Sequence, residues 1–281
     1  MSSGGSILLI PTSGLANRLR IIAVSIKLAR TSGKKLTVYW NNDDGLKADF
    51  DDLFILPMQF SIHKIPLKYK IWTLMTHYSS KLFGLDNLYL RLFNFDFIFR
   101  DSMAPLVWHN KMNLQQEVDK ANKVLVCSCQ EINYFSLEDY HFFKPQAYIQ
   151  KQIDELTLNF KPGVIGIHIR STDNTESIKN SPFELFIKKI EEELKSNPEA
   201  SFFLATDNED YQNRILQKFG SEKIIFQAKQ FRRDVVDGII DAVIDLFCLS
   251  KTSKIYGSYF SSFSHVAGRI GQIPVEEVKV T

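Results

Sequence analysis

Short apolar runs alternate along the chain with longer stretches whose apolar residues recur every three or four positions. In the first half, the run at Ser6–Pro11 predicts a strand, residues 19–29 have helical spacing, and Gly33 ends that helix. A second strand is predicted at residues 36–40, which completes a βαβ unit. Since strands that alternate with helices in this way build parallel sheets, the first half is expected to be Rossmann-like.

The second half repeats the pattern more regularly. A helix separates each predicted strand from the next, and the strands are residues 164–169, 201–205, 223–226 and 254–256. The whole chain is therefore expected to be an α/β protein with two Rossmann-like domains, residues 1–145 and 146–281. Their parallel sheets are expected to face each other across a cleft.

Residues 64–100 depart from this pattern because aromatic and basic side chains are concentrated there. Every second residue from Phe93 to Phe99 is a phenylalanine, which is the period of a half-buried strand, and the part before them suits an amphipathic helix. We expect a helical or hairpin insertion with its own core. The alternative is a surface that contacts the acceptor or anionic lipid.

Composition excludes several classes of protein. A net charge of +2 is too small to indicate nucleic-acid binding, and no nucleic-acid-binding motif is found. The three cysteines, Cys127, Cys129 and Cys248, are an odd number in apolar runs, which favours buried thiols over disulfides. No apolar run of 18 residues and no export signal is found, so the sequence predicts a cytoplasmic protein with at most peripheral contact with the inner face of a membrane.

The turn after the first strand contains candidate ligand-binding residues. A glycine-bearing turn that leads into a helix can hold an anion, and Asn17 and Arg18 lie at this helix start. The turn has neither the Gly-x-Gly-x-x-Gly motif nor a P-loop, which disfavours a Rossmann oxidoreductase or an NTPase. Asn17 and Arg18 are therefore candidate donor contacts, with a plain helix start and a solvated arginine as the alternative.

Polar residues follow three strands of the second half. His168 and Arg170 lie at the end of one strand, Asp207 follows the next, and the third leads to Ser258, Ser261 and Ser262. A parallel sheet brings these strand ends to one edge, where ligands bind in open α/β folds. Arginine keeps its charge and presents a planar fork of donors that suits phosphate. The alternative is an ion pair at the sheet edge, with the serines as ordinary helix caps.

These motifs together resemble the inverting fucosyltransferases of the α1,6-, protein-O- and nodulation type. The matching segments are His168-Ile-Arg-Ser-Thr-Asp173, Ala205-Thr-Asp207 and Phe260-Ser-Ser262, with a looser match at Gly14-Leu-Ala-Asn-Arg-Leu19. The resemblance implies a GT-B fold, GDP-fucose as donor and no metal or other cofactor. It assigns Arg170 to the β-phosphate, Asp207 to the guanine side, and Ser261 with Ser262 to the diphosphate.

The chain departs from this pattern at two positions. Ser171 stands where the α1,6 branch has a second arginine, and Phe263 stands where some relatives have a polar residue. Two carboxylates are candidates for the catalytic base, Asp173 and Glu176. For Glu176 the alternative is an ordinary surface glutamate.

The sequence thus predicts a glycosyltransferase that transfers fucose from GDP-fucose with inversion. Its second half is expected to bind the nucleotide sugar, and its first half a glycan or another hydroxyl acceptor. One alternative is a non-catalytic module that binds a nucleotide sugar, and another is a glycosyltransferase with a different donor.

Overall fold

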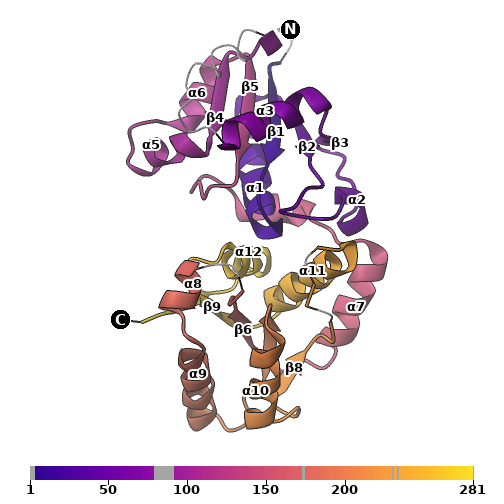
Figure 1. Cartoon of the computed structure of the whole chain (residues 1–281), viewed down its shortest axis with the longest axis vertical. Helices are drawn as coiled ribbons and strands as arrows, with labels where there is room; N and C mark the ends of the chain where they lie inside the picture. Colours follow the sequence, from indigo (N-terminus) through magenta and orange to yellow (C-terminus); the bar gives the residue numbers. More distant parts are fainter. Residues whose placement is uncertain (1–3, 79–91, 173–174, 230, 233, 281) are drawn as a thin grey trace. The chain divides into compact units, whose positions relative to one another are not determined.

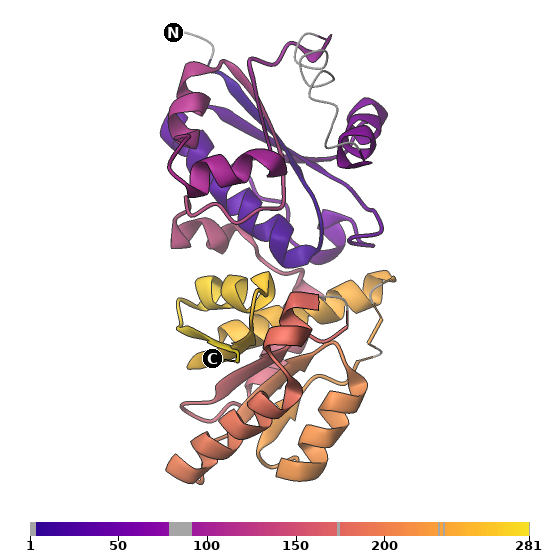
Figure 2. The same cartoon turned by 60° about the vertical axis from the view of Figure 1, so that its left-hand side comes forward.

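The computed structural model describes residues 4–78, 92–172, 175–229, 231–232 and 234–280. The chain divides into two compact units, Met1–Lys144 and Pro145–Thr281. Each unit contains one five-stranded sheet, and all strand pairs within the two sheets are parallel. Figure 2 shows helices on both faces of each sheet. The prediction of an α/β protein with two parallel sheets is therefore confirmed.

The first unit has the strand order β3-β2-β1-β5-β4. Its elements in chain order are β1 (Ser6–Pro11), α1 (Leu15–Ser32), β2 (Lys35–Trp40), α2 (Phe50–Leu53), β3 (Ser61–Lys64), α3 (Leu67–Tyr78), β4 (Phe97–Arg100), a 3-10 turn (Asp101–Met103), α5 (Ala104–Trp108), α6 (Leu114–Lys120), β5 (Lys123–Ser128) and a second 3-10 turn (Leu137–Phe142). Gly33 ends α1 in the left-handed conformation, as its position in the sequence indicates.

The aromatic and basic segment is part of this unit's sheet and core, which corrects the expectation of an insertion with its own core. Its last residues form β4, which pairs with β5, so the segment carries the chain from one edge of the sheet to the other. Tyr69 and Trp72 of α3 pack with Phe95 and Ile98 in one buried cluster that includes β1 and β5 residues. The aromatic side chains are needed here because they cover one face of the sheet. Residues 79–91 lie outside the described residues.

The second unit has the strand order β10-β9-β6-β7-β8. Its elements are α7 (Ala147–Thr157), β6 (Ile165–Ile169), α8 (Thr175–Asn180), α9 (Phe183–Ser196), β7 (Phe202–Thr206), α10 (Glu209–Phe219), β8 (Ile224–Phe226), α11 (Val236–Ser250), β9 (Lys254–Ser258), α12 (Ser262–Gly271) and β10 (Val275–Val278). Every residue of β6 and of β7 is buried, as expected for central parallel strands.

The strand order fixes where a ligand can bind. From β6 the chain moves outward through β7 to β8, and it then returns to place β9 and β10 on the other side of β6. The sheet therefore changes direction between β6 and β9, and ligands of open α/β sheets bind beyond the carboxyl ends of the strands at such a point. In the first unit the corresponding point lies between β1 and β5.

A glycine in β9 allows α12 to pack closely on this sheet. A Cβ atom added to Gly257 would lie 2.3 Å from Ser264 Oγ and 2.5 Å from Ser264 Cβ. This close approach brings Ser264 of α12 within 3.2 Å of His168 Nδ1 on β6. The start of α12 is thereby held beside the ends of β6 and β9.

We expect Gly257→Ala to destabilise the second unit by about 1–3 kcal/mol, because the new methyl group overlaps the Ser264 side chain. Ser264→Gly removes that side chain, so Gly257→Ala should cost clearly less in a Ser264→Gly background. Urea denaturation of the four proteins of this double-mutant cycle measures the difference. An equal cost in both backgrounds would show that the contact does not set the distance between α12 and β9.

Candidate functional site

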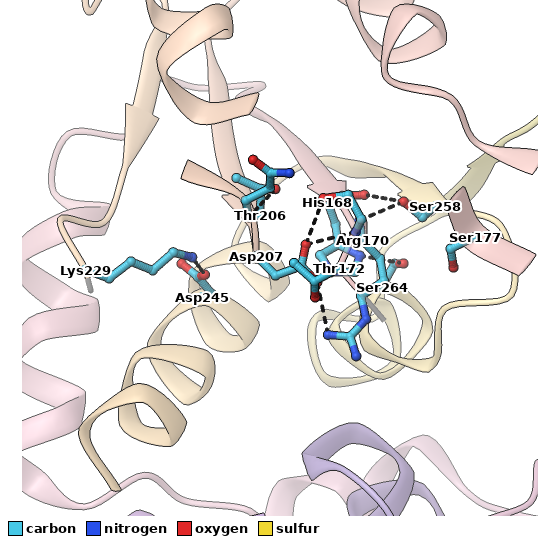
Figure 3. Close-up of polar contacts among 12 residues, drawn as sticks. His168, Arg170, Thr172, Ser177, Thr206, Asp207, Lys229, Asp245, Ser258 and Ser264 are labelled. Atoms are coloured by element: carbon cyan, nitrogen blue, oxygen red, sulfur yellow. Dashed lines mark hydrogen bonds and ion pairs between the residues drawn. The ribbon is translucent and has the colours of Figure 1, made fainter. Parts of the chain in front are cut away.

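Asp207, which directly follows β7, holds the loop that follows β6. Its Oδ1 accepts hydrogen bonds from the backbone N–H of Ser171 at 2.9 Å and from the Ser171 hydroxyl at 3.3 Å. Its Oδ2 accepts from the Thr172 hydroxyl at 2.8 Å and forms an ion pair with Arg170 Nη1 at 3.3 Å. Figure 3 shows Arg170 and Thr172 next to Asp207. Both oxygens of Asp207 thus serve to position the β6 loop.

Arg170 is also fixed at its backbone. Its N–H donates to the Ser258 hydroxyl at 2.9 Å, and that hydroxyl lies 3.4 Å from the carbonyl oxygen of His168. Ser258 is fully buried and follows the last residue that pairs β9 with β6. Its hydroxyl therefore supplies hydrogen bonds at the point where the backbone pairing of these strands ends. The Arg170 side chain is 26% exposed, so part of it is open to solvent although its backbone is held in place.

His168 is enclosed by α12. It is 6% exposed, its ring stacks on Phe263 with centroids 4.8 Å apart, and its Nδ1 is hydrogen-bonded to Ser264. In this structure His168 and Ser258 therefore contribute to the packing beneath the site. Phe263 and Ser264 lie in the first turn of α12. Sequence reasoning did not assign these contacts to them.

The serine turn, Tyr259–Ser262, is fixed by two side chains from outside it. The Ser177 hydroxyl donates to the carbonyl oxygen of Tyr259, and the Tyr259 N–H donates to Ser181 Oγ, each at 2.7 Å. Phe260 then takes a positive φ of 55°, and Ser261 is the N-cap residue of α12 without a side-chain cap bond. Ser261 is buried, whereas Ser262 in the first turn is half-buried.

A serine before a proline is a common helix start, but Ser181 does not cap α9. Pro182 is the N-cap residue of α9, and the Ser181 hydroxyl donates instead to the carbonyl oxygen of Val278 at 2.5 Å. Ser181 thus links α9 both to β10 and to the serine turn. The sequence did not predict the strand β10, because two of its four residues are glutamates and it has no apolar run.

The two candidate bases are placed differently. Glu176 lies in the first turn of α8, is exposed, and accepts a hydrogen bond from Asn180 Nδ2 at 3.3 Å. These contacts agree with the surface-glutamate alternative for Glu176. Asp173 lies outside the described residues.

The turn after β1 corrects the expectation for Arg18. Arg18 is fully buried, and its guanidinium donates to the carbonyl oxygen of Ser13 at 2.6 Å, to that of Asn41, and to Asp43 Oδ1 at 2.8 Å. It also lies over the Trp40 ring. Burial lowers the pKa of Arg18, and Asp43 opposes this shift.

Arg18 therefore joins two loops of the first unit and is neither a ligand-facing nor a solvated cation. Asn17 is half-buried and donates to the Ser13 hydroxyl at 2.9 Å.

A polar pocket of about 220 Å³ follows β8 and was not anticipated from the sequence. Lys229 and Asp241 line it, and Lys229 forms a buried ion pair with Asp245 of α11. Burial raises the pKa of Asp245, and Lys229 opposes that shift. Asp245 Oδ1 and Gln227 Oε1 are buried and have no hydrogen-bond partner among the described residues. Gln227 and Asp245 do not line the pocket themselves and contact its lining residues Asp241 and Lys229.

No protein-family model matches this sequence. Solved structures do match it. NodZ α-1,6-fucosyltransferase soaked with GDP-fucose superposes with a TM-score of 0.62 at 16% identity, over 97% of this chain and 94% of that one. POFUT1 in complex with GDP-fucose gives a TM-score of 0.57 at 11% identity over 99% of both chains. A mutant of FUT1 from Arabidopsis thaliana in complex with GDP gives 0.59 at 16% identity, over 96% of this chain and 70% of that one.

The chain shares the GT-B fold of these fucosyltransferases. The expected fold is confirmed over nearly the whole chain, including segments in which no motif was recognised. At these identities the likeness concerns the fold, and the activity has to be argued from the residues. Among the described residues of this GT-B fold, no helix could cross a membrane and no group of His, Cys, Asp or Glu could hold a metal ion.

Replacement of Arg18 should destabilise the first unit without changing nucleotide affinity. We expect Arg18→Met to lower the free energy of unfolding by about 3 kcal/mol, because Asp43 and two carbonyl groups lose their shared donor. Asn17→Ala removes a single exposed bond and should cost under about 1 kcal/mol. Thermal melts and GDP titrations of both variants test this. A fully stable Arg18→Met protein with lost GDP affinity would restore Arg18 as a donor contact.

Proposed function

We propose that this protein is a glycosyltransferase that transfers fucose from GDP-fucose, with inversion, to a hydroxyl of an acceptor. The observation that carries this proposal is the fixed position of Arg170 at the switch point of the second sheet. Asp207 holds its guanidinium and Ser258 holds its backbone. The serine turn lies at the end of the neighbouring strand, β9. In this proposal the second unit binds the donor and the first unit binds the acceptor.

Arg170 would stabilise the leaving group. When the bond between sugar and phosphate breaks, negative charge develops on the β-phosphate oxygen. A positioned guanidinium and the free N–H groups at the start of α12 suit that charge, and Ser261 and Ser262 lie at this helix start. Because these groups supply positive charge, no divalent ion is required.

The pocket after β8 supports guanine as the base. Guanine carries N–H donors at N1 and at its amino group on one edge, and carboxylate oxygens are suitable acceptors. Asp237 and Asp241 line the pocket and carry such oxygens. The resemblance assigns Asp207 to the guanine side, but in this proposal its oxygens position the β6 loop instead. It would support the donor site through Arg170.

The catalytic base would be a carboxylate near the donor sugar, and Asp173 is our first candidate. It follows Thr172, which Asp207 holds in place. The exposed position of Glu176 and its bond to Asn180 make it the weaker candidate. Without a functional base the protein would be a nucleotide-sugar-binding module, and turnover of GDP-fucose distinguishes the two functions. A cytoplasmic location and contact with a membrane stay part of the hypothesis.

Donor class is tested with a thermal-shift panel of nucleotides. GDP should raise the melting temperature more than ADP, UDP, CMP or NAD, because a ligand that binds the native state stabilises it by mass action. The response to GDP should be the same in excess EDTA. A larger shift with UDP or NAD would contradict the proposed donor, and loss of the shift in EDTA would contradict metal independence.

Arg170→Ala should reduce kcat by roughly 10² to 10³-fold, the usual effect of removing one positioned donor to a developing negative charge. Arg170→Lys keeps the charge but loses the planar fork, so it should recover only a small part of the rate. Thermal melting serves as the control, since Asp207 retains its bonds to Ser171 and Thr172 in both variants. If Arg170→Ala turned over normally, Arg170 would be only a structural ion pair at the sheet edge.

A further inference from the structure

One tryptophan of the first unit differs from the other two. Trp40 and Trp72 are 3% and 1% exposed and belong to the core, whereas Trp108 is 49% exposed. Trp108 is the last residue of α5, which follows β4 through a short 3-10 turn and lies beside that strand in Figure 1. This large aromatic side chain thus lies near the carboxyl edge of the first sheet.

The exposed ring is held in a defined orientation. Its Nε1–H donates to the carbonyl oxygen of Glu131 at 2.5 Å. Glu131 follows β5, one of the two strands at the switch point of this sheet. Arg20 of α1 fixes the Glu131 segment, since Nη1 contacts Glu131 Oε2 at 3.0 Å and Nε donates to the carbonyl oxygen of Cys129 at 2.9 Å.

The residue that accepts the Trp108 hydrogen bond also carries a charged side chain. The Glu131 carboxylate is 37% exposed, and Asp101, in the turn before α5, accepts hydrogen bonds from Ser128 Oγ at 2.6 Å and Cys129 N–H at 2.9 Å. An aromatic face beside charged hydrogen-bonding groups suits a pyranose ring. Such a ring has an apolar face of C–H groups, which is attracted to the electron-rich face of an indole, and hydroxyls around its edge. Lipid and protein partners would favour a wider apolar surface.

We propose that Trp108 is the stacking platform for a sugar ring of the acceptor, which makes the acceptor a glycan. This inference rests on the proposed transferase function and adds the acceptor class and the residue that recognises it. Trp108 contacts the acceptor and takes no part in bond cleavage, so its replacement should affect acceptor binding and leave donor binding unchanged.

The test uses tetrasaccharides and GDP as separate probes of the whole chain. Cellotetraose and chitotetraose are linked through equatorial substituents and so expose flat C–H faces, whereas a β-1,4-linked galactotetraose has one axial C4–O bond per ring. Acrylamide should quench mainly Trp108, because the other two tryptophans are buried. We expect an equatorial tetrasaccharide to protect Trp108 from quenching more than the galactose analogue does.

Variants of α5 supply the controls. Trp108→Leu should weaken tetrasaccharide binding, measured by calorimetry, by about tenfold or more, as for an aromatic contact at the centre of a binding site. Trp108→Phe keeps a ring but loses the bond to Glu131, and should be intermediate. Leu106→Ala changes another exposed side chain of the same helix and should bind as the wild type does. GDP affinity should be the same in all four proteins.

Two results would overturn the proposal. One is that no tetrasaccharide of the panel protects Trp108, and the other is that Trp108→Leu binds them as well as the wild type. Protection by anionic vesicles alone would make this surface a membrane contact and would equally refute it. The proposed donor is judged separately by GDP binding. If GDP bound but no saccharide did, only the acceptor inference would fail.

Discussion

The candidate site depends on one carboxylate at the edge of a parallel sheet. Where β6 ends, its ladder partners end too, and the following loop would be left without fixed hydrogen bonds. Asp207 supplies acceptors to the backbone of Ser171 and to two side-chain hydroxyls, and it pairs with Arg170. Hydrogen bonds to an ionised acceptor are stronger than neutral ones, so this single side chain can order a short polar loop. Because Asp207 already holds the Arg170 guanidinium, this side chain loses little further conformational entropy when it binds a phosphate.

The first unit uses the same arrangement. Asp101 follows β4 as Asp207 follows β7, and its Oδ1 accepts from Ser128 and Cys129 at the end of the neighbouring strand. The side chain beside Asp101 is the Cys129 thiol, whereas the side chain beside Asp207 is an arginine. Burial and the nearby Asp101 charge raise the pKa of Cys129 to about 11, so it stays protonated at neutral pH. The same support therefore holds an arginine at one sheet edge and a neutral thiol at the other.

Much of the fold could be predicted from the sequence because its central strands are short, apolar and bounded by helical patterns. The edge strands β3 and β10 were missed, since half-exposed strands lack an apolar run and depend on a neighbour for their hydrogen bonds. The alternating phenylalanines did indicate a strand that overlaps β4. The site was predictable as a set of strand ends but not as a set of contacts. Ser177 and Ser181 hold the serine turn from positions about 80 residues away along the chain, and no local pattern reveals such partners.

Arg18 and Arg170 show most clearly where sequence reasoning ends. Both lie just beyond a buried strand beside small polar residues, and both were assigned to the donor. Arg18 is fully buried because two carbonyl groups and Asp43 converge on its guanidinium. The Arg170 guanidinium pairs with Asp207, and the side chain stays 26% exposed. The burial of Arg18 thus depends on backbone carbonyl groups. Every residue has a carbonyl group, so the amino-acid sequence does not show which ones will meet an arginine. A fully buried guanidinium requires acceptors from the protein itself, whereas a partly exposed one can also be reached by a ligand from solvent.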